Sequence, residues 1–279
     1  MGQRRFLVMA RVGNASLHRR WISGEGRRFD LFLSCYGDRP QEYAADAEYL
    51  REMKSTKWPA WHAHILEERA LVASYDAVWF PDDDLLIDTA GINRMFDLFM
   101  AFELAMAQPA LSLDSYYSHP ILLQDAGHIV RFTNFVEVMG PVFSREALAV
   151  LHPTFSQSRT GWGLDYLWPS LLYERGMGSK IAVIDAVSMI HTRPVGGGDI
   201  YQGQADAGSA DLARLSELYP DAHIDPRYQG DNLSVYATVP APCFRSGLLA
   251  KFRARCAAYL AKRAERLVPK YGTSRRGPQ

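Results

Sequence analysis

The 279-residue chain is predicted to fold as an α/β protein with an open, mixed and mainly parallel sheet flanked by helices. Short apolar runs rich in Phe, Val, Ile and Leu alternate along the chain with longer segments of helical period. The composition, 48% hydrophobic and 22% charged, is that of an ordinary globular protein of one large domain or two small ones. Strands that alternate with helices favour parallel pairing, because the chain returns to the sheet through helical crossovers.

In the first half of the chain, four apolar runs predict buried strands: FLVMA at 6–10, FDLFLS at 29–34, AVWF at 77–80 and ALSLD at 110–114. A helix is predicted between the last two, with Asp88 as its N-cap. The apolar face of this helix follows helical spacing through Ile92, Met95, Phe96 and Phe99. A further helix is predicted around Trp61, Ile65 and Val72.

In the second half, the run 131–144 predicts a strand with a break at Gly140-Pro141. Ser144 is a predicted N-cap for the helix that follows it. The long apolar run 181–190 predicts another strand, which ends at His191. The segment 195–211 is rich in glycine and small residues and predicts a mobile loop.

The charge of the chain divides it into a main domain at 1–240 and a basic helical tail at 241–279. From Arg245 onward there are ten Lys/Arg and one acid, so this segment carries +9 and the preceding residues carry −9. Residues 246–268 predict a basic amphipathic helix, which can rest on an anionic membrane surface, dock on a partner or pack on its own domain. Nucleic-acid binding is disfavoured, since the basic charge is confined to this segment.

The cellular compartment of the protein is inferred from its cysteines, its apolar runs and its N-terminal segment. The chain has three cysteines and no CxxC pair, and no apolar run approaches the roughly 20 residues that span a bilayer. The N-terminal segment resembles a first strand more than a signal peptide. We therefore expect a reducing, cytoplasmic setting, with peripheral contact at the inner membrane face if the tail helix binds lipid.

The stretch DAVWFPDDDLLI, at 76–87, ends a buried strand in three adjacent acids. Ligands of open parallel sheets bind beyond the carboxyl ends of strands, and carboxylate oxygens suit Mg²⁺ or Mn²⁺. Strand alternation would bring Asp82 and Asp84 together, and His191, at the end of a later strand, could be a third ligand. The alternative is a solvated acidic turn that caps a helix, with His191 as an ordinary hydrogen-bonding residue.

Residues near these acids suggest how a substrate could bind. Arg193 could neutralise a diphosphate through two hydrogen bonds. In GWGLD, at 161–165, Gly163 permits close backbone approach, Trp162 offers a flat apolar face for a sugar, and Asp165 could be the general base for an incoming hydroxyl. Asp165 could instead be only a first-turn acid that interacts with a helix dipole.

Other polar residues next to predicted strands are also candidates for substrate binding. Glu137 belongs to this group because a carboxylate in a buried strand needs a partner. The full group is Arg11, Gly13 and Asn14 after the first strand, Ser115 and His119 in DSYYSHP, and Glu137 in the run 131–144.

Taken together, the motifs RVGNASLHRRW, FDLFLSCYGD, YDAVWFPDDDL, AMAQPALSLDSYYSHP, RFTNFVEVMGPVFSREAL, GWGLD and IDAVSMIHTRPVG resemble the family catalogued as domain of unknown function 707, from about residue 4 to 201. That family is grouped with nucleotide-diphospho-sugar transferases of GT-A fold. The resemblance implies a GT-A-like domain in which Asp82 and Asp84 hold Mn²⁺ or Mg²⁺ with His191, and Asp165 is the base. It implies a nucleotide-diphosphate sugar as donor and a hydroxyl of a glycan, surface polysaccharide or other glycoconjugate as acceptor.

Two other functions compete with this metal-dependent glycosyltransferase. A phosphatase with an Asp nucleophile also begins with a strand followed by DxD, but its motif belongs on the first strand and is followed by Thr or Val, whereas Leu85-Leu86 follows here. A non-catalytic module that binds sugar nucleotides or carbohydrate would keep the metal site without turnover. The donor sugar, the nucleotide base of the donor and the stereochemistry of transfer do not follow from the motifs.

Overall fold

The computed structural model describes residues 4–194, 207–222, 224 and 233–241. By backbone contacts the chain divides into Met1–Ala241 and Pro242–Gln279. The predicted tail helix at 246–268 and the glycines at 196–198 lie outside the described residues. No helix in the described part is long and apolar enough to cross a membrane.

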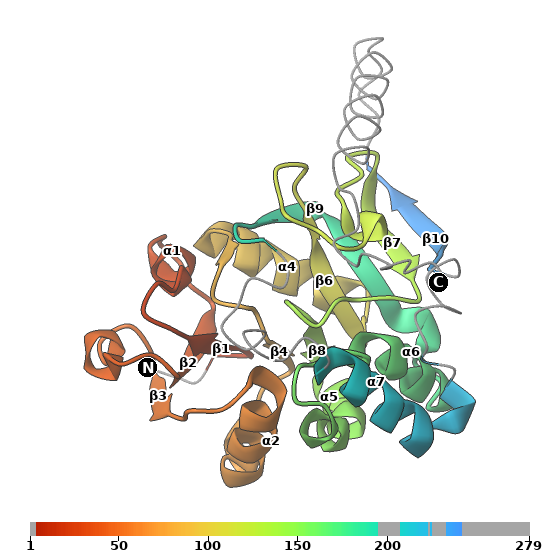
Figure 1. The fold of residues 1–279 in the computed structure, drawn as a ribbon. Coiled ribbons are helices and arrows are strands. Elements are labelled where there is room, and N and C mark those ends of the chain that lie inside the picture. The colour runs from red at the N-terminus through yellow and green to blue at the C-terminus, as the bar shows by residue number, and fades with distance from the viewer. Residues whose placement is uncertain (1–3, 195–206, 223, 225–232, 242–279) are drawn as a thin grey trace, which may run out of the picture. The chain divides into compact units, whose positions relative to one another are not determined.

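The first unit is built on one mixed sheet with helices on both faces (Figure 1). Its strands are β1 (Phe6–Val12), β2 (Phe29–Cys35), β3 (Tyr49–Glu52), β4 (Ala77–Trp79), β5 (Leu85–Leu86), β6 (Met106–Leu111), β7 (His128–Thr133), β8 (Val142–Ser144), β9 (Ile181–His191) and β10 (Val235–Pro240). Its α-helices are α1 (His18–Ile22), α2 (Lys57–Glu67), α3 (Arg69–Val72), α4 (Thr89–Ala101), α5 (Arg145–Leu151), α6 (Leu164–Glu174) and α7 (Ala207–Leu218).

The strand order is β10-β7-β9-β6-β8-β4-β1-β2-β3, with β5 paired to β9 outside this path. Strands β1, β2, β3 and β4 pair in parallel, as do β6 and β9. Strand β8 lies between β4 and β6 and is antiparallel to both, so β6 and β9 run in the same direction as β4. The carboxyl ends of β1, β4, β6 and β9 therefore meet at one edge of the sheet.

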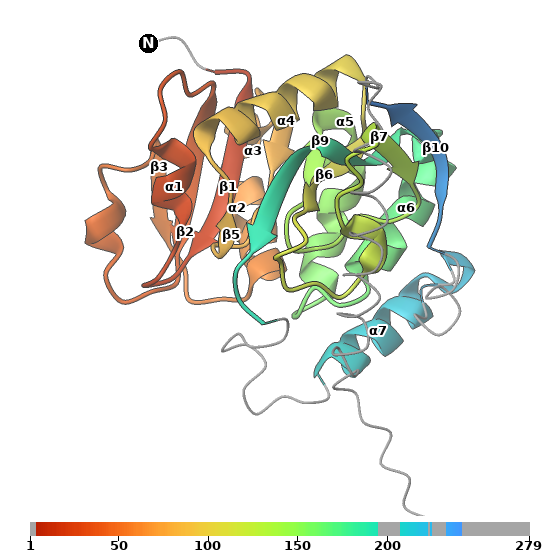
Figure 2. The same ribbon diagram turned by 90° about the horizontal axis from the view of Figure 1, so that it is seen from above.

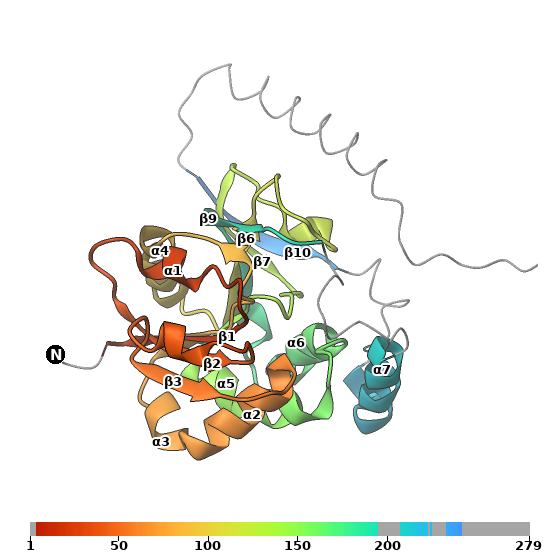
Figure 3. The ribbon, with the colours of Figure 1, turned by 60° about the vertical axis from the view of Figure 1, so that its left-hand side comes forward.

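Helices cover both faces of this sheet. Helices α1 and α4 lie on one face, and α2, α3 and α5 lie on the other, as the views from above and from the side show (Figure 2 and Figure 3). Helix α4 begins at the predicted cap, because Asp88 Oδ1 accepts a hydrogen bond of 2.7 Å from the Gly91 amide. Helix α5 begins in the same way at Ser144, whose hydroxyl accepts from the Ala147 amide.

A buried aromatic cluster fills the space between α2, α6 and the sheet. Its centre is Trp58, whose ring lies 4.6 Å from that of Phe155 and 4.8 Å from that of Trp168, in edge-to-face arrangements that aromatic rings prefer. Phe80, the residue after β4, and Phe143 of β8 add their rings to the cluster. This cluster fixes α2 and the start of α6 against the end of β4.

The structure corrects three expectations. The predicted strand at 110–114 lies earlier, as β6 ends at Leu111. The run 131–144 contains two strands, β7 and β8, and Glu137 lies in the connection between them and not in a strand. The acids at 82–84 form a turn between β4 and β5, so strand alternation does not determine where their side chains point.

Candidate functional site

The acidic turn lies at the carboxyl edge of the sheet, where main-chain hydrogen bonds fix it. The Phe80 amide donates to the Pro141 carbonyl at 2.9 Å, and the Asp82 amide donates to the Met139 carbonyl at 2.7 Å. The turn then continues into β5, where Leu85 pairs with His191. Each of the three acids has a different neighbour as a result.

Asp84 and His191 are brought together by the β5–β9 pairing. Asp84 Oδ2 lies 3.4 Å from His191 Nε2, and both residues are buried. His191 Nδ1 lies 3.0 Å from the Tyr116 carbonyl oxygen, which can only accept, so Nδ1 carries the hydrogen. In neutral His191, Nε2 therefore has a free lone pair that faces the carboxylate.

These two residues fit a divalent cation. Asp84 Oδ1 is buried and has no hydrogen-bond partner among the described residues, and such an atom is costly unless a ligand satisfies it. Burial lowers the pKa of His191, but the hydrogen bond to Asp84 and the charges of Asp84 and Asp82 raise it more, so the site attracts positive charge. A carboxylate oxygen beside an imidazole whose other nitrogen is fixed by a carbonyl is a common metal-ligand arrangement.

Asp82 has a different partner, Lys57, which belongs to none of the predicted site motifs. Lys57 Nζ lies 2.6 Å from Asp82 Oδ1, 2.8 Å from the Val138 carbonyl and 3.1 Å from the Met139 carbonyl. Within the described residues, no three acidic, His or Cys side chains form one metal-binding group. Asp82 as a ligand together with Asp84 and His191 therefore stays a prediction.

A signal for Lys57 was present in the sequence. Lys57 is the first residue of α2, where a positive charge is unfavourable beside the positive end of the helix dipole. The Lys57 side chain is only 15% exposed, and a lysine that is largely covered at such a position needs an anion. The sequence could not show which acid supplies it, because Asp82 is 25 residues away along the chain.

Asp83 points toward the end of β1. Its Oδ2 accepts a hydrogen bond of 2.8 Å from the Gly13 amide and one of 3.3 Å from the Tyr36 hydroxyl. Arg193 Nη1 lies 3.4 Å from Asp83 Oδ1, and Arg193 Nη2 donates to the Ala15 carbonyl at 2.7 Å. The structure thus brings the predicted loop after β1 and the predicted arginine to the same acid.

The loop after β1 is closely packed. A Cβ atom on Gly13 would come within 2.7 Å of the Tyr36 hydroxyl, so only glycine fits there unless the ring moves. Asn14 Oδ1 accepts from the Asp38 amide at 2.9 Å. Arg11 is buried and donates to Ser34 and to the carbonyls of residues 53 and 55, and burial lowers its pKa to about 10. Arg11 therefore ties β1 to the chain after β3.

Asp165 comes after the acidic turn in the sequence and lies in the first turn of α6. It is 6% exposed, and its Oδ1 has no hydrogen-bond partner among the described residues. Burial and the charge of Glu137 raise the pKa of Asp165 to about 8, although backbone amides that include Val138 favour the ionised form. A carboxyl group whose pKa lies near neutrality is suited to accept a proton.

Glu137 has a similar environment. It is 8% exposed, and its Oε2 is buried without a hydrogen-bond partner in the described part of the chain. Burial raises the pKa of Glu137 to about 7, and His191 and Lys57 oppose this effect. Its amide donates to the Gln108 side chain of β6 at 2.8 Å, which fixes the connection between β7 and β8.

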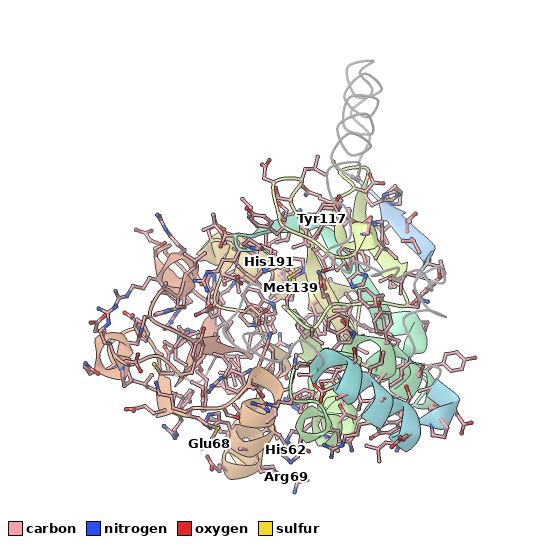
Figure 4. All side chains as sticks on the ribbon, viewed as in Figure 1. His62, Glu68, Arg69, Tyr117, Met139 and His191 are labelled. Carbon is pink, nitrogen blue, oxygen red and sulfur yellow. The ribbon has the colours of Figure 1, made fainter. Side chains whose placement is uncertain are left out.

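The remaining predicted residues, His119 and Ser115, contact other parts of the site. His119 packs its ring 4.5 Å from Phe135 and 6.2 Å from Tyr166, and burial lowers the pKa of His119 to about 4. The Ser115 hydroxyl accepts from the His191 amide at 3.2 Å and so supports that histidine. Figure 4 labels His191 and Met139 in the middle of the face shown, whereas His62 of α2, its C-cap Glu68 and Arg69 of α3 lie away from them.

The GWG motif shapes the start of α6. Gly161 and Gly163 have φ of +87° and +91°, which L side chains rarely adopt. One face of Trp162 packs against Gly208 of α7, where an added Cβ would come within 2.6 Å of the ring. Asp211 of α7 accepts hydrogen bonds from the Thr160 amide and hydroxyl at 2.7 and 2.6 Å. Helix α7 therefore holds the loop that presents Asp165.

Comparisons with known proteins support the fold. No family model and no curated protein sequence matches the chain, so the resemblance to the domain of unknown function 707 is not confirmed. Among solved structures, S. aureus TarS aligns with a TM-score of 0.51 at 9% identity, over 81% of this chain and 41% of TarS. A mycobacterial protein aligns with a TM-score of 0.48 at 14% identity, over 86% of this chain and 85% of that protein.

This chain therefore spans less than half the length of TarS. At 9% identity the likeness to TarS shows the fold alone. The predicted fold class is confirmed: the chain has a mixed, mostly parallel sheet flanked by helices, of the kind found in a glycosyltransferase.

Proposed function

We propose that this protein is a metal-dependent glycosyltransferase, which moves a sugar from a nucleotide-diphosphate donor to a hydroxyl of a glycan or other glycoconjugate. The observation that carries the proposal is the pairing of Asp84 with His191 at the carboxyl edge of the sheet. One atom of that pair, Asp84 Oδ1, is buried without a partner among the described residues. A GT-A type fold, in which such an edge holds the donor, adds general support.

In this proposal Asp84 and His191 hold Mn²⁺ or Mg²⁺, with Asp82 as a further candidate ligand. The cation, when bound, neutralises charge on the donor diphosphate as it leaves. Arg193 is exposed beside Asp83 and can donate two parallel hydrogen bonds to the same diphosphate. The loop at Gly13 and Asn14, whose Gly13 amide donates to the same Asp83, is the proposed binding place of the nucleotide.

The transfer step uses Asp165. The acceptor hydroxyl oxygen forms a bond to the anomeric carbon of the sugar, and the bond from that carbon to the diphosphate oxygen breaks, with its electron pair leaving on the diphosphate. The ionised Asp165 takes the proton of the hydroxyl, for which its buried Oδ1 is suited. The wall formed by His119, Phe135 and Tyr166 offers apolar ring faces beside it.

The experiment that tests this proposal is calorimetric titration with sugar nucleotides, with Mn²⁺ and with EDTA. A thermal-shift screen of sugar nucleotides first identifies the donor. Asp84→Ala is expected to weaken Mn²⁺-dependent donor binding at least 10–100-fold, which is roughly the loss seen when metal-site groups are removed. Asp97→Ala, at an exposed aspartate of α4, is the matched control and should bind as the wild type does.

Unchanged Mn²⁺-dependent binding by Asp84→Ala would show that the cation is held elsewhere. The alternative of a non-catalytic binding module predicts donor binding without transfer or donor hydrolysis. It is distinguished by following nucleotide diphosphate release with a panel of hydroxyl acceptors.

A further inference from the structure

A cavity of about 610 Å³ lies beside the β5–β9 pairing, on the side that faces away from His191. In this pairing Leu85 lies opposite His191, and Leu86 lies opposite Ile190. Successive side chains of a strand point to opposite faces, so Leu86 and Ile190 point away from the face that holds His191. Both of them line the cavity, and none of its described lining residues belongs to the proposed metal or substrate site. Its volume is within the range of about 300–1,000 Å³ that small-molecule sites have.

The walls of this cavity are held in place by hydrogen bonds. Trp21 of α1 is fully buried and donates from Nε1 to the Leu85 carbonyl at 2.8 Å. The Thr89 hydroxyl, at the start of α4, donates to the Trp21 carbonyl at 2.7 Å and accepts from the Gly24 amide at 2.9 Å. Because α1, β5 and α4 all contribute lining residues, these bonds fix the cavity in the absence of a ligand. Small-molecule sites are usually pre-formed in this way.

Two arginines give the cavity its positive charge. Arg20 of α1 and Arg94 of α4 are exposed, and neither guanidinium has a hydrogen bond or ion pair with a described residue. By contrast, the neighbouring Arg19 donates to Asp46 at 2.8 Å. One acid, Asp88, also lines the cavity, and its carboxylate already caps α4. The described lining residues therefore carry a net charge of +1, from two arginines and one aspartate.

An apolar surface belongs to the same cavity. Leu86 is a large apolar residue, yet it is 36% exposed, and Ile190, its cross-strand partner, is partly exposed as well. Ser188 is exposed and adds a hydroxyl group to the lining. It lies two residues before Ile190 in β9, and residues two apart on a strand share a face. The cavity therefore offers apolar contact, a hydroxyl group and positive charge to one ligand.

We propose that this cavity binds an organic phosphate, whose phosphate group is held by Arg20 and Arg94 and whose apolar part contacts Leu86 and Ile190. A phosphate monoester carries about two negative charges and has three acceptor oxygens, so it can accept from both guanidinium groups. A carboxylate, with one charge and two oxygens, would satisfy only one of them. The site goes beyond the proposed function, because it uses no residue of the proposed donor or acceptor site.

The proposal is tested by calorimetric titration of the full-length protein with phenyl phosphate, in EDTA and without sugar nucleotide. The wild type should bind phenyl phosphate. Arg20→Gln and Arg94→Gln should each weaken this binding by at least about 10-fold, since each removes charge-assisted hydrogen bonds. Arg175→Gln is the matched control, because Arg175 is an exposed arginine at the end of α6 that does not line the cavity, and it should bind as the wild type does.

A second variant tests the cavity itself. Ser188→Phe keeps both arginines but fills the space from β9, so it should abolish binding of phenyl phosphate. Phenol, which lacks the phosphate, and inorganic phosphate, which lacks the apolar part, should both bind more weakly than phenyl phosphate. The proposal is overturned if the wild type does not bind phenyl phosphate, or if the two arginine variants bind it as tightly as the wild type.

The same phosphate chemistry could come from a soluble compound or from a lipid headgroup. Co-sedimentation with phosphatidylcholine vesicles, with and without phosphatidic acid, separates these sources. Vesicle binding that needs phosphatidic acid and is lost in both Arg20→Gln and Arg94→Gln would identify a headgroup. Binding of phenyl phosphate without such vesicle binding would identify a soluble organic phosphate. Neither assay uses metal or donor, so failure here leaves the proposed glycosyltransferase untouched, and failure of sugar transfer leaves this site untouched.

Discussion

The glycine that precedes Trp162 offers a direct test of how the site is held in place. In Gly161→Ala, two effects act together. The backbone keeps a φ of +87°, which costs an L residue about 1–2 kcal/mol. The new Cβ would also lie 2.7 Å from two atoms of the Trp58 ring. Trp58 is 1% exposed and packed between Phe155 and Trp168, so it cannot move away, and overpacking of this kind costs about 1–3 kcal/mol.

We therefore expect Gly161→Ala to lower the free energy of unfolding by about 2–5 kcal/mol, measured by equilibrium urea denaturation. The matched control is Gly26→Ala, where φ is +70° and no atom lies within 4 Å of the added Cβ. The control should lose only the unfolding free energy that comes from the backbone conformation, about 1–2 kcal/mol. If the two variants lose equal stability, then contact with Trp58 does not constrain the loop before α6, and the argument is refuted.

Three further predictions concern other buried groups. Asp165→Asn should keep donor binding and lose transfer in a coupled assay, and it should also flatten the pH dependence of stability. The pKa of Asp165 in the folded protein is about 8, above its value in the unfolded chain. The contribution of Asp165 to the stability of the folded state is therefore complete below the unfolded pKa and is lost as the pH rises toward 8. Thermal melts of the wild type at a series of pH values measure this loss. Asp185→Asn should cost about 3–5 kcal/mol in urea denaturation, because Arg131 donates to Asp185 at 2.7 and 2.9 Å and would be left as an uncompensated buried charge. Lys57→Met should weaken donor binding in calorimetry, since Asp82 loses its partner at 2.6 Å, and binding equal to that of the wild type would show that this ion pair is not needed.

Local signals in the sequence predicted much of the fold. The caps Asp88 and Ser144 start α4 and α5 as expected, because each places a side-chain oxygen within reach of its own helix. The apolar run that ends at His191 is β9. These features depend on residues a few positions apart, which is the range over which periodicity and capping are informative.

Long-range contacts were harder to predict. Burial of the whole run 131–144 concealed that Glu137 lies between two strands, since a buried connection carries the same apolar pattern as a strand. The association of Asp82 with Lys57 depends on where α2 packs against the sheet. The sequence does not indicate that position. The nearness of Asp84 to His191 was predicted from strand ends, and the structure supports it at 3.4 Å.

That nearness depends on a very short element. Strand β5 has two residues, and their pairing with β9 sets Leu85 opposite His191. Successive residues of a strand point to opposite sides, so a slip of one position would turn the imidazole away from Asp84. Inserting or deleting a single residue near the end of β9 should therefore be far more damaging than altering the length of surface loops. Homologous chains that share this chemistry should differ in the lengths of the surface loops between the two groups, yet keep this local alignment unchanged.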